Sequence, residues 1–195
     1  EFISEIERKP TGTIKDLLTL KLAMLKELQD TVPSLYIGGS IGLLLHGVDL
    51  QRDLGASDFD LVMNKNHKGC LDAFISEMDS RSGRTVIKSD NVWKRSHSTD
   101  FDLRLALPVV RENISGTKSV VYVKTEIRFL NNDELETPDW VSVTYKGVIY
   151  HVQNLESILK WKKKYADDGY EKHYVDLKVI ETGLPRKTFE SGLPF

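Results

Sequence analysis

The sequence has little cysteine, no long apolar run and almost no net charge. Cys70 is the one cysteine among 195 residues, which excludes a disulfide framework and a cysteine-based zinc site and favours a reducing compartment. No apolar stretch approaches the roughly 18 residues of a membrane-spanning helix, and no signal-peptide pattern opens the printed sequence. We therefore expect a cytoplasmic protein without a membrane partner. The formal net charge of -2 provides no overall basic field for nucleic acid.

Histidine and the aromatic residues are also arranged without a familiar binding pattern. The five histidines show no metal-ligand spacing, and the three tryptophans and seven tyrosines do not interleave with basic residues as in platforms for single-stranded nucleic acid. No repeat, low-complexity tract or linker divides the chain. A single domain over residues 1–195 is therefore expected, since this length is enough to bury a core.

Hydrophobic periodicity predicts helices and strands in alternation. The expected elements are a helix over 14–30, a strand at 35–37, a helix opening at Ser40, a strand over 57–63, a helix over 70–78, strands over 84–89, 99–110 and 119–130, a hairpin over 141–152, helices over 154–165 and 170–181, and an irregular tail over 182–195. Such interleaving predicts an α/β (α+β) fold, with a core at about 35–150 and a C-terminal helix pair at about 154–181.

Two aspartates stand out in the expected strand over 57–63. Asp58 and Asp60 lie two positions apart, so their side chains leave the same face of the strand. Two carboxylates so close repel each other unless a proton or a cation lies between them. Mg²⁺ prefers oxygen ligands of this kind and commonly shares them with substrate phosphates. The pair indicates a divalent-cation site, although a solvated strand face carries the same pattern.

Gly38, Gly39 and Ser40 lie between an apolar strand and an apolar helix. Glycines let a ligand come close to the backbone, and a helix start offers unpaired N–H groups and the positive end of a dipole. We therefore expect Gly38-Gly39-Ser40 to bind a phosphate group, with Ser40 as the helix N-cap. The alternative is a tight strand-to-helix turn with a capping serine and no ligand.

A third carboxylate would complete a site for two metal ions, and the sequence offers two candidates. Glu126 lies on a later expected strand and joins the aspartate pair if the two strands are neighbours. Asp102, which repeats the aspartate spacing with Asp100, is the competitor. We favour Glu126, whose other interpretation is a cross-strand partner of Arg104 or Arg128.

These motifs together resemble the DNA polymerase β-type nucleotidyltransferase superfamily, in which Gly-Gly-Ser opens a helix, Asp-x-Asp follows on a strand, and a later strand adds a carboxylate. The segment 155–177, LESILKWKKKYADDGYEKHYVDL, is similar to minimal bacterial nucleotidyltransferase domains and to AbiEii-type toxins of toxin–antitoxin systems. In those proteins a helix lysine is followed by a basic residue, three more residues and Asp-Leu. Here the three features fall at Lys162, Lys172 and Asp176-Leu177, and the resemblance covers about residues 36–177.

The chain departs from this pattern at three points. The interval from Ser40 to Asp58 is longer than is usual in the superfamily, which requires the loop between them to be an insertion. The arginine that often stands just ahead of the toxin aspartates is here as far upstream as Arg52. His173 stands where the toxins often have a second acidic residue.

The resemblance implies a nucleotidyltransferase-type mixed sheet flanked by helices, and an activity that moves an NMP from an NTP such as ATP to an acceptor hydroxyl with release of pyrophosphate. It implies that Mg²⁺ (or Mn²⁺) is bound by three carboxylates, those of Asp58, Asp60 and Glu126. It also implies six nucleotide-binding residues, namely Gly38, Gly39, Ser40, Lys162, Lys172 and Asp176. The acceptor would be RNA, a protein or a small molecule, and the toxin resemblance would add an antitoxin protein as a partner.

Other interpretations remain open on the sequence. Lys162 fits a solvated helix face, and Lys172 with Asp176 fits an ordinary i, i+4 ion pair. The long interval between Ser40 and Asp58 motivates a second interpretation, a catalytically inactive nucleotidyltransferase-fold module that binds nucleotide or a protein partner. A metal-dependent hydrolase built on the same carboxylates is a third interpretation, distinguished by release of free nucleotide without an acceptor.

Overall fold

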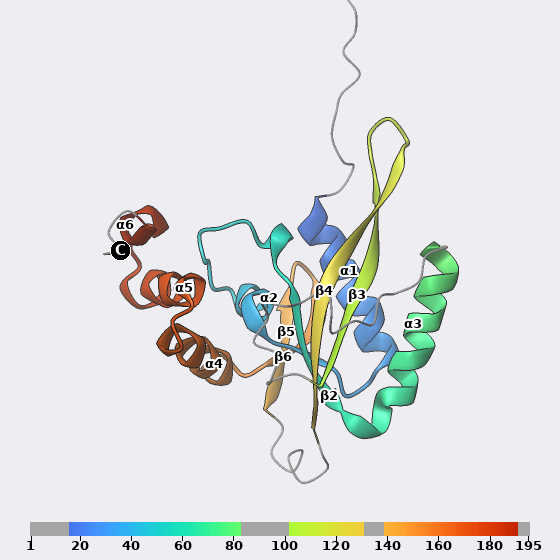
Figure 1. The fold of residues 1–195 in the computed structure, drawn as a ribbon, viewed down its shortest axis with the longest axis horizontal. Coiled ribbons are helices and arrows are strands. Elements are labelled where there is room, and N and C mark those ends of the chain that lie inside the picture. The colour runs from blue at the N-terminus through green and yellow to red at the C-terminus, as the bar shows by residue number, and fades with distance from the viewer. Residues whose placement is uncertain (1–15, 83–101, 131–138, 191–195) are drawn as a thin grey trace, which may run out of the picture.

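A computed structural model describes residues 16–82, 102–130 and 139–190 of the chain. Its centre is a six-stranded mixed sheet with the strand order β3-β4-β2-β1-β6-β5 (Figure 1). The strands are β1 (Tyr36–Ile37), β2 (Phe59–Asn64), β3 (Leu103–Glu112), β4 (Lys118–Leu130), β5 (Trp140–Tyr145) and β6 (Val148–Gln153). The helices are α1 (Leu17–Thr31), α2 (Gly39–Leu45), α3 (Lys68–Ser82), α4 (Leu155–Asp167), α5 (Glu171–Thr182) and α6 (Arg186–Glu190).

Two antiparallel hairpins, β3–β4 and β5–β6, form the outer parts of the sheet. Between them, β2 runs parallel to β4 and antiparallel to β1, and β1 runs parallel to β6. Successive side chains of a strand point to opposite faces, so β2 and β4 each present their even-numbered residues on one face and their odd-numbered residues on the other. One face of the centre is therefore apolar and the other carries the charged residues.

The helices form two groups on opposite sides of this sheet (Figure 1). α1 and α3 pack together against β3, whereas α4, α5 and α6 follow one another on the other side. α2 lies between β2 and α4 and contacts both. The turn that leads from β1 into α2 is thereby enclosed between the sheet and the C-terminal helices.

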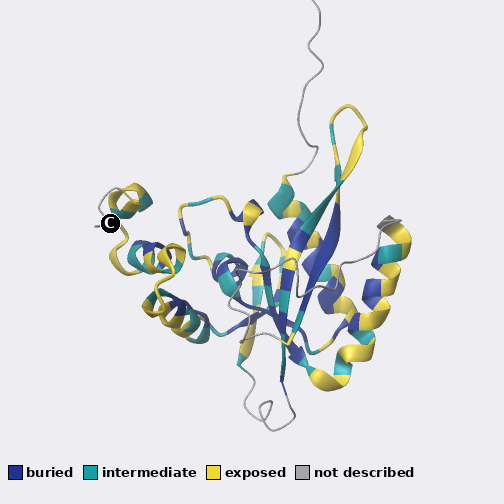
Figure 2. Ribbon diagram, viewed as in Figure 1, coloured by how far each residue is buried: buried dark blue, intermediate teal, exposed yellow. Residues whose placement is uncertain are grey.

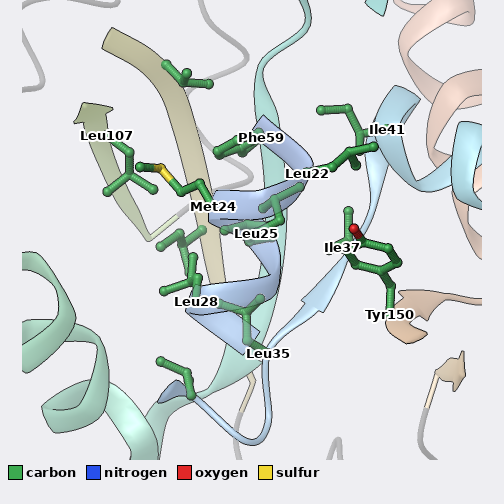
Figure 3. Close-up of a cluster of buried hydrophobic side chains, with 14 of the residues drawn as sticks. Leu22, Met24, Leu25, Leu28, Leu35, Ile37, Ile41, Phe59, Leu107 and Tyr150 are labelled. Carbon is green, nitrogen blue, oxygen red and sulfur yellow. The ribbon is translucent and has the colours of Figure 1, made fainter. Parts of the chain in front are cut away.

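The hydrophobic core lies between α1, α3 and the apolar face of the sheet. Figure 3 shows side chains of α1, Leu25 and Leu28 among them, packed with Ile37, Phe59 and Leu107 from the strands. All five side chains are buried, and the ribbon in Figure 2 is correspondingly dark along the central strands and pale on the outer surfaces of the helices. Burial on this scale is the main force that holds the sheet against α1.

The predicted α/β (α+β) class, with a mixed sheet flanked by helices and a C-terminal helix pair, is confirmed. The first helix begins after Asp16, whose carboxylate accepts a hydrogen bond of 2.7 Å from the Thr19 amide as an N-cap. The prediction of an irregular tail over 182–195 was wrong at α6, which continues the helical run after a turn at Gly183. The strand expected over 84–89 lies outside the described residues. None of the helices in the described ranges has the length and apolar character that a membrane crossing requires.

Candidate active site

Three carboxylates gather where the charged faces of β2 and β4 meet. Asp60 and Glu126 are direct partners in the parallel register, and Asp58 precedes Asp60 by two residues on the same side. Adjacent strands lie about 4.8 Å apart, so the two partner carboxylates are close neighbours. Burial raises the pKa of Asp60 to about 7, and the negative charges of Glu126 and Asp58 add to that rise. Burial also raises the pKa of Asp58.

The two glycines at the start of α2, Gly38 at the N-cap and Gly39 at the first helical position, make room for Asp60. Gly39 has a φ of +62°, and a Cβ at this position would lie 2.8 Å from Asp60 Cγ and closer still to Asp60 Oδ2. The Gly38 amide donates a 2.7 Å hydrogen bond to the Asp60 carbonyl oxygen, and a Cβ at Gly38 would lie 2.7 Å from Gln153 Oε1. The glycines therefore hold the turn and the Asp60 strand in direct contact.

On the other side of that turn, three cations surround the buried carboxylate of Asp176. Arg52 donates to it through Nε and Nη2, both at 3.0 Å; Lys162 Nζ lies at 2.6 Å and Arg186 Nη1 at 2.7 Å. Burial alone would raise the pKa of Asp176, but these hydrogen bonds and charges outweigh it and hold the pKa well below its usual range. Arg186 also binds the exposed Glu190 at 2.7 Å, so the cluster still holds more cations than carboxylates.

Ser40 lies against the cation cluster. The prediction that Ser40 is the helix N-cap was wrong: Gly38 is the N-cap, and Ser40 lies in the first turn of α2. Its hydroxyl oxygen accepts hydrogen bonds from Arg52 Nη2 at 2.7 Å and from Lys162 Nζ at 3.3 Å. A serine oxygen has two lone pairs, so its O–H remains as a donor for a further oxygen.

The two predicted lysines occupy different positions. Lys162 is buried; burial lowers its pKa, while the neighbouring Asp176 opposes that change. Lys172 is exposed at the start of α5, and its positive charge partly opposes the burial-driven rise in the pKa of Asp58 and Asp60. Asp176 has no exposed surface, so any contribution that it makes to nucleotide binding passes through the cations that it holds.

Two arginines of this cluster received no role from the sequence. Arg52 comes from the loop between α2 and β2, and its Nη1 also donates to Ser57 Oγ at 3.2 Å. Arg186 comes from α6 and also donates to the Leu50 carbonyl oxygen at 3.3 Å. The toxin resemblance pointed to an arginine ahead of the aspartates, and Arg52 is the nearest one in this sequence. No comparable signal marked Arg186, because its contact forms only when α6 folds back beside α5.

The loop that carries Arg52 is fixed from α1 by a lysine. Lys21 is buried, and its Nζ donates to the carbonyl oxygens of Gly55 and Ser57, the latter at 2.8 Å. Burial lowers the pKa of Lys21, while Asp58 and Asp53 favour its charged form. The long interval between Ser40 and Asp58 is thus a loop fixed by hydrogen bonds that ends directly before Asp58.

The structure separates the two candidates for the third carboxylate. Glu126 lies beside Asp60, and its Oε1 is 3.7 Å from Arg104 Nε. Asp102 lies in the bend before β3, where its Oδ2 accepts a 2.7 Å hydrogen bond from the Phe129 amide. Asp102 is therefore engaged with the backbone of β4, whereas Glu126 is the carboxylate that the sheet brings next to the aspartate pair.

The donor chemistry of Asp58, Asp60 and Glu126 suits a hard divalent cation, since all are carboxylates. Across the described ranges, no group of three or more His, Cys, Asp or Glu side chains is arranged to hold a metal ion. Mg²⁺ commonly takes only one or two protein carboxylates and completes its shell with substrate phosphates and water. The Asp60–Glu126 pairing fits such shared ligation better than a cage made by protein alone.

No protein-family model matches the chain, and no curated protein matches its sequence. Solved structures do resemble it. An antigenic nucleotidyltransferase-like protein from Paracoccidioides brasiliensis is 16% identical with a TM-score of 0.51, over 93% of this chain and 88% of that protein. The antibiotic-resistance factor ANT(2'')-Ia is 16% identical with a TM-score of 0.53, over 91% of this chain and 90% of that protein. A structure of ANT(2")-Ia in complex with adenylyl-2"-tobramycin is also 16% identical, with a TM-score of 0.50 over 89% of this chain and 98% of that one. The chain therefore has a nucleotidyltransferase-type fold.

Proposed function

We propose that the protein is a metal-dependent nucleotidyltransferase that moves an NMP from an NTP to an acceptor hydroxyl. The observation that carries the proposal is the arrangement around Gly39 and Ser40. An acidic group, with Asp60 and Glu126 in register, lies on one side of this turn, and a cation cluster held by Asp176 lies on the other. A metal-bound triphosphate has the complementary distribution of charge.

Each part of the site has a defined task in this reaction. The free O–H of Ser40 donates to a phosphate oxygen, while Lys172 adds positive charge at the exposed edge. Asp58 and Asp60 would hold Mg²⁺ (or Mn²⁺), which when bound neutralises charge on the entering and departing oxygens. Glu126 accepts the proton of the acceptor hydroxyl, which attacks the α-phosphorus as pyrophosphate leaves. The chemistry is mainly positioning and electrostatic stabilisation.

The comparisons support this assignment at the level of the fold. One similar structure is a complex with adenylyl-2"-tobramycin, which is a product of nucleotidyl transfer to a hydroxyl. In this protein the residues around Gly39 and Ser40 would hold the nucleotide, and the acceptor would be its own.

The test is label transfer from each of four α-³²P NTPs in Mg²⁺ and nuclease-free cell extract, resolved for RNA, protein and small molecules. We expect Asp60→Asn and Glu126→Gln to lower transfer by about 10²-fold or more, as for other losses of transition-state stabilisation. Asp102→Asn is the matched control and should stay within a few-fold of wild type. Wild-type transfer that survives Asp60→Asn would overturn the proposal, and loss in Asp102→Asn with an active Glu126→Gln would move the third carboxylate to Asp102.

A non-catalytic nucleotide-binding module is the second candidate. It is favoured by the finding that no three acidic side chains in the described ranges are set to hold a metal ion. It requires that wild type bind NTP without labelling any product. Release of free nucleotide without an acceptor would indicate a hydrolase instead.

A second part of the proposal is that the transferase acts as the toxin of a toxin–antitoxin pair. It requires growth arrest on expression in a bacterial host, and arrest that disappears in Asp58→Asn and Asp60→Asn. An antitoxin partner would be identified as the gene product that restores growth. Growth unaffected by wild-type expression would remove the toxin role and leave the transfer reaction in place.

A further inference from the structure

On the side of Glu126 away from Asp60, the sheet presents a buried arginine. Arg104 of β3 is the register partner of Glu126, and only 8% of its surface is exposed. Among the described residues, its Nε and Nη2 have no hydrogen-bond partner; Nε lies 3.7 Å from Glu126 Oε1, which is an ion pair beyond hydrogen-bond distance. Three neighbouring strands thus carry Asp60, Glu126 and Arg104 in one row.

A second arginine extends this surface toward the C-terminal helices. Arg128 lies two residues beyond Glu126 on the same face of β4, and its buried Nε also lacks a hydrogen-bond partner within the part of the chain that the structure describes. Its guanidinium lies 5.3 Å from the ring centroid of Trp161 on α4. This cation–π contact joins the Arg128 side chain of β4 to α4.

Arg104, Arg128 and Lys124 place three cations on this face, beside the carboxylates of Asp60 and Glu126. Asp102 is bonded to the Phe129 amide, so among the described residues the unpartnered groups here are the donors of the two arginines. A guanidinium stays charged in proteins, and buried donors seldom remain unpartnered. Its planar fork matches phosphate oxygens, so a phosphate is the ligand that these donors suit.

Together with the proposed function, on which this inference rests, the arrangement gives the acceptor a chemical class. We propose that Arg104 and Arg128 bind a phosphate group of the acceptor, which therefore carries a phosphate close to its attacking hydroxyl. The NTP would lie on the Asp60 side, and the acceptor would approach Glu126 from the Arg104 side. Polynucleotide ends and sugar phosphates meet this requirement, whereas a polyamine such as tobramycin does not.

Direct binding tests this proposal without requiring turnover. The probe is a fluorescein-labelled single-stranded RNA 12-mer with a free 3′ hydroxyl, titrated with wild type and displaced by ribose 5-phosphate or by tobramycin. We expect Arg104→Gln to weaken RNA binding at least tenfold and Arg104→Lys to weaken it less. Arg111→Gln is the matched control, because Arg111 lies seven residues along β3, roughly 23 Å away, and also has a buried, unpartnered Nε. It should stay within twofold of wild type.

Each outcome bears on one of the two claims. Displacement by ribose 5-phosphate indicates that a single phosphate suffices, and RNA binding without such displacement indicates a polynucleotide acceptor. Equal binding by wild type and Arg104→Gln, or tighter binding of tobramycin than of both phosphate probes, overturns the inference. If Arg104→Gln fails to fold by thermal melting, Arg128→Gln replaces it with the same expectation. Phosphate binding that depends on Arg104, in a protein that transfers no nucleotide, would refute the proposed function alone.

Discussion

At the scale of single residues, Asp60 is held in the most unfavourable electrostatic position of the site. Its pKa rises to about 7 because it is buried beside Glu126 and Asp58, so the folded chain binds a proton that the unfolded chain releases near pH 4. The free energy of unfolding should therefore fall as pH rises from about 4 to about 7. Above pH 7 the free energy of unfolding is lowered by the full amount, up to about 4 kcal/mol at about 1.4 kcal/mol per pKa unit.

Asp60→Asn removes this loss of stability, and under the proposed function it also lowers transfer by about 10²-fold or more. Urea denaturation in EDTA should show the variant more stable than wild type at pH 8, with the difference shrinking toward pH 4. Adding Mg²⁺ with NTP at pH 8 should stabilise wild type and not the variant, since a bound ligand stabilises the folded state that binds it. A wild type as stable as Asp60→Asn at pH 8 in EDTA would contradict the crowding of the carboxylates.

The sequence predicted some residues of the site and missed others for a physical reason. Asp58, Asp60 and Ser40 could be found because strand alternation and a Gly-Gly-Ser turn are local patterns. Glu126 needed one further assumption, the pairing of β2 with β4, which the structure bears out. The contact of Arg186 with Asp176 forms only because α6 packs beside α5, and no local sequence pattern predicts such tertiary packing.

At the scale of elements, the turn from β1 into α2 fixes the distance between the acidic and basic parts of the site. Gly39→Ala forces a side chain into a left-handed φ and against the Asp60 carboxylate. The strain alone costs about 1–2 kcal/mol, and the collision adds to it. We expect a loss of at least about 2 kcal/mol in the free energy of unfolding, measured by urea denaturation.

Gly147→Ala is the matched control for this substitution. Gly147 has a φ of +78° in the β5–β6 turn, and a Cβ there would meet nothing within 4 Å. It therefore reports the backbone strain without a collision, and the excess loss in Gly39→Ala reports the contact with Asp60. Equal losses of unfolding free energy in Gly39→Ala and Gly147→Ala would show that a side chain at position 39 does not collide with Asp60.

The elements themselves were predictable wherever hydrophobic periodicity was strong. The helices α1, α4 and α5 and the β5–β6 hairpin lie within a few residues of their expected ranges. α6 was missed because its five residues, Arg186–Glu190, are too few and too polar to show a helical period. Its place is set instead by the contacts of Arg186, which are tertiary.

At the scale of the whole molecule, Asp176 joins parts of the chain that are far apart in sequence. Its carboxylate binds Arg52 from the loop after α2, Lys162 from α4 and Arg186 from α6, and it lies itself on α5. Removing one partner of a buried ion network leaves the remaining charges uncompensated. Asp176 is therefore expected to determine whether the C-terminal helices stay docked beside α2.

Asp176→Asn should lower the free energy of unfolding by about 3–5 kcal/mol at pH 7. The pKa of Asp176 is held below its unfolded value, so its contribution is complete above about pH 4 and is lost as pH falls further, when the unfolded chain takes up the proton first. Urea denaturation from pH 7 to pH 3 should therefore show the two proteins converging at the acid end. Asp30→Asn, which removes an exposed ion pair with Lys26, is the control and should change stability by no more than about 1 kcal/mol at any pH. A difference between wild type and Asp176→Asn that stays constant down to pH 3 would assign the effect to packing rather than to the buried charge.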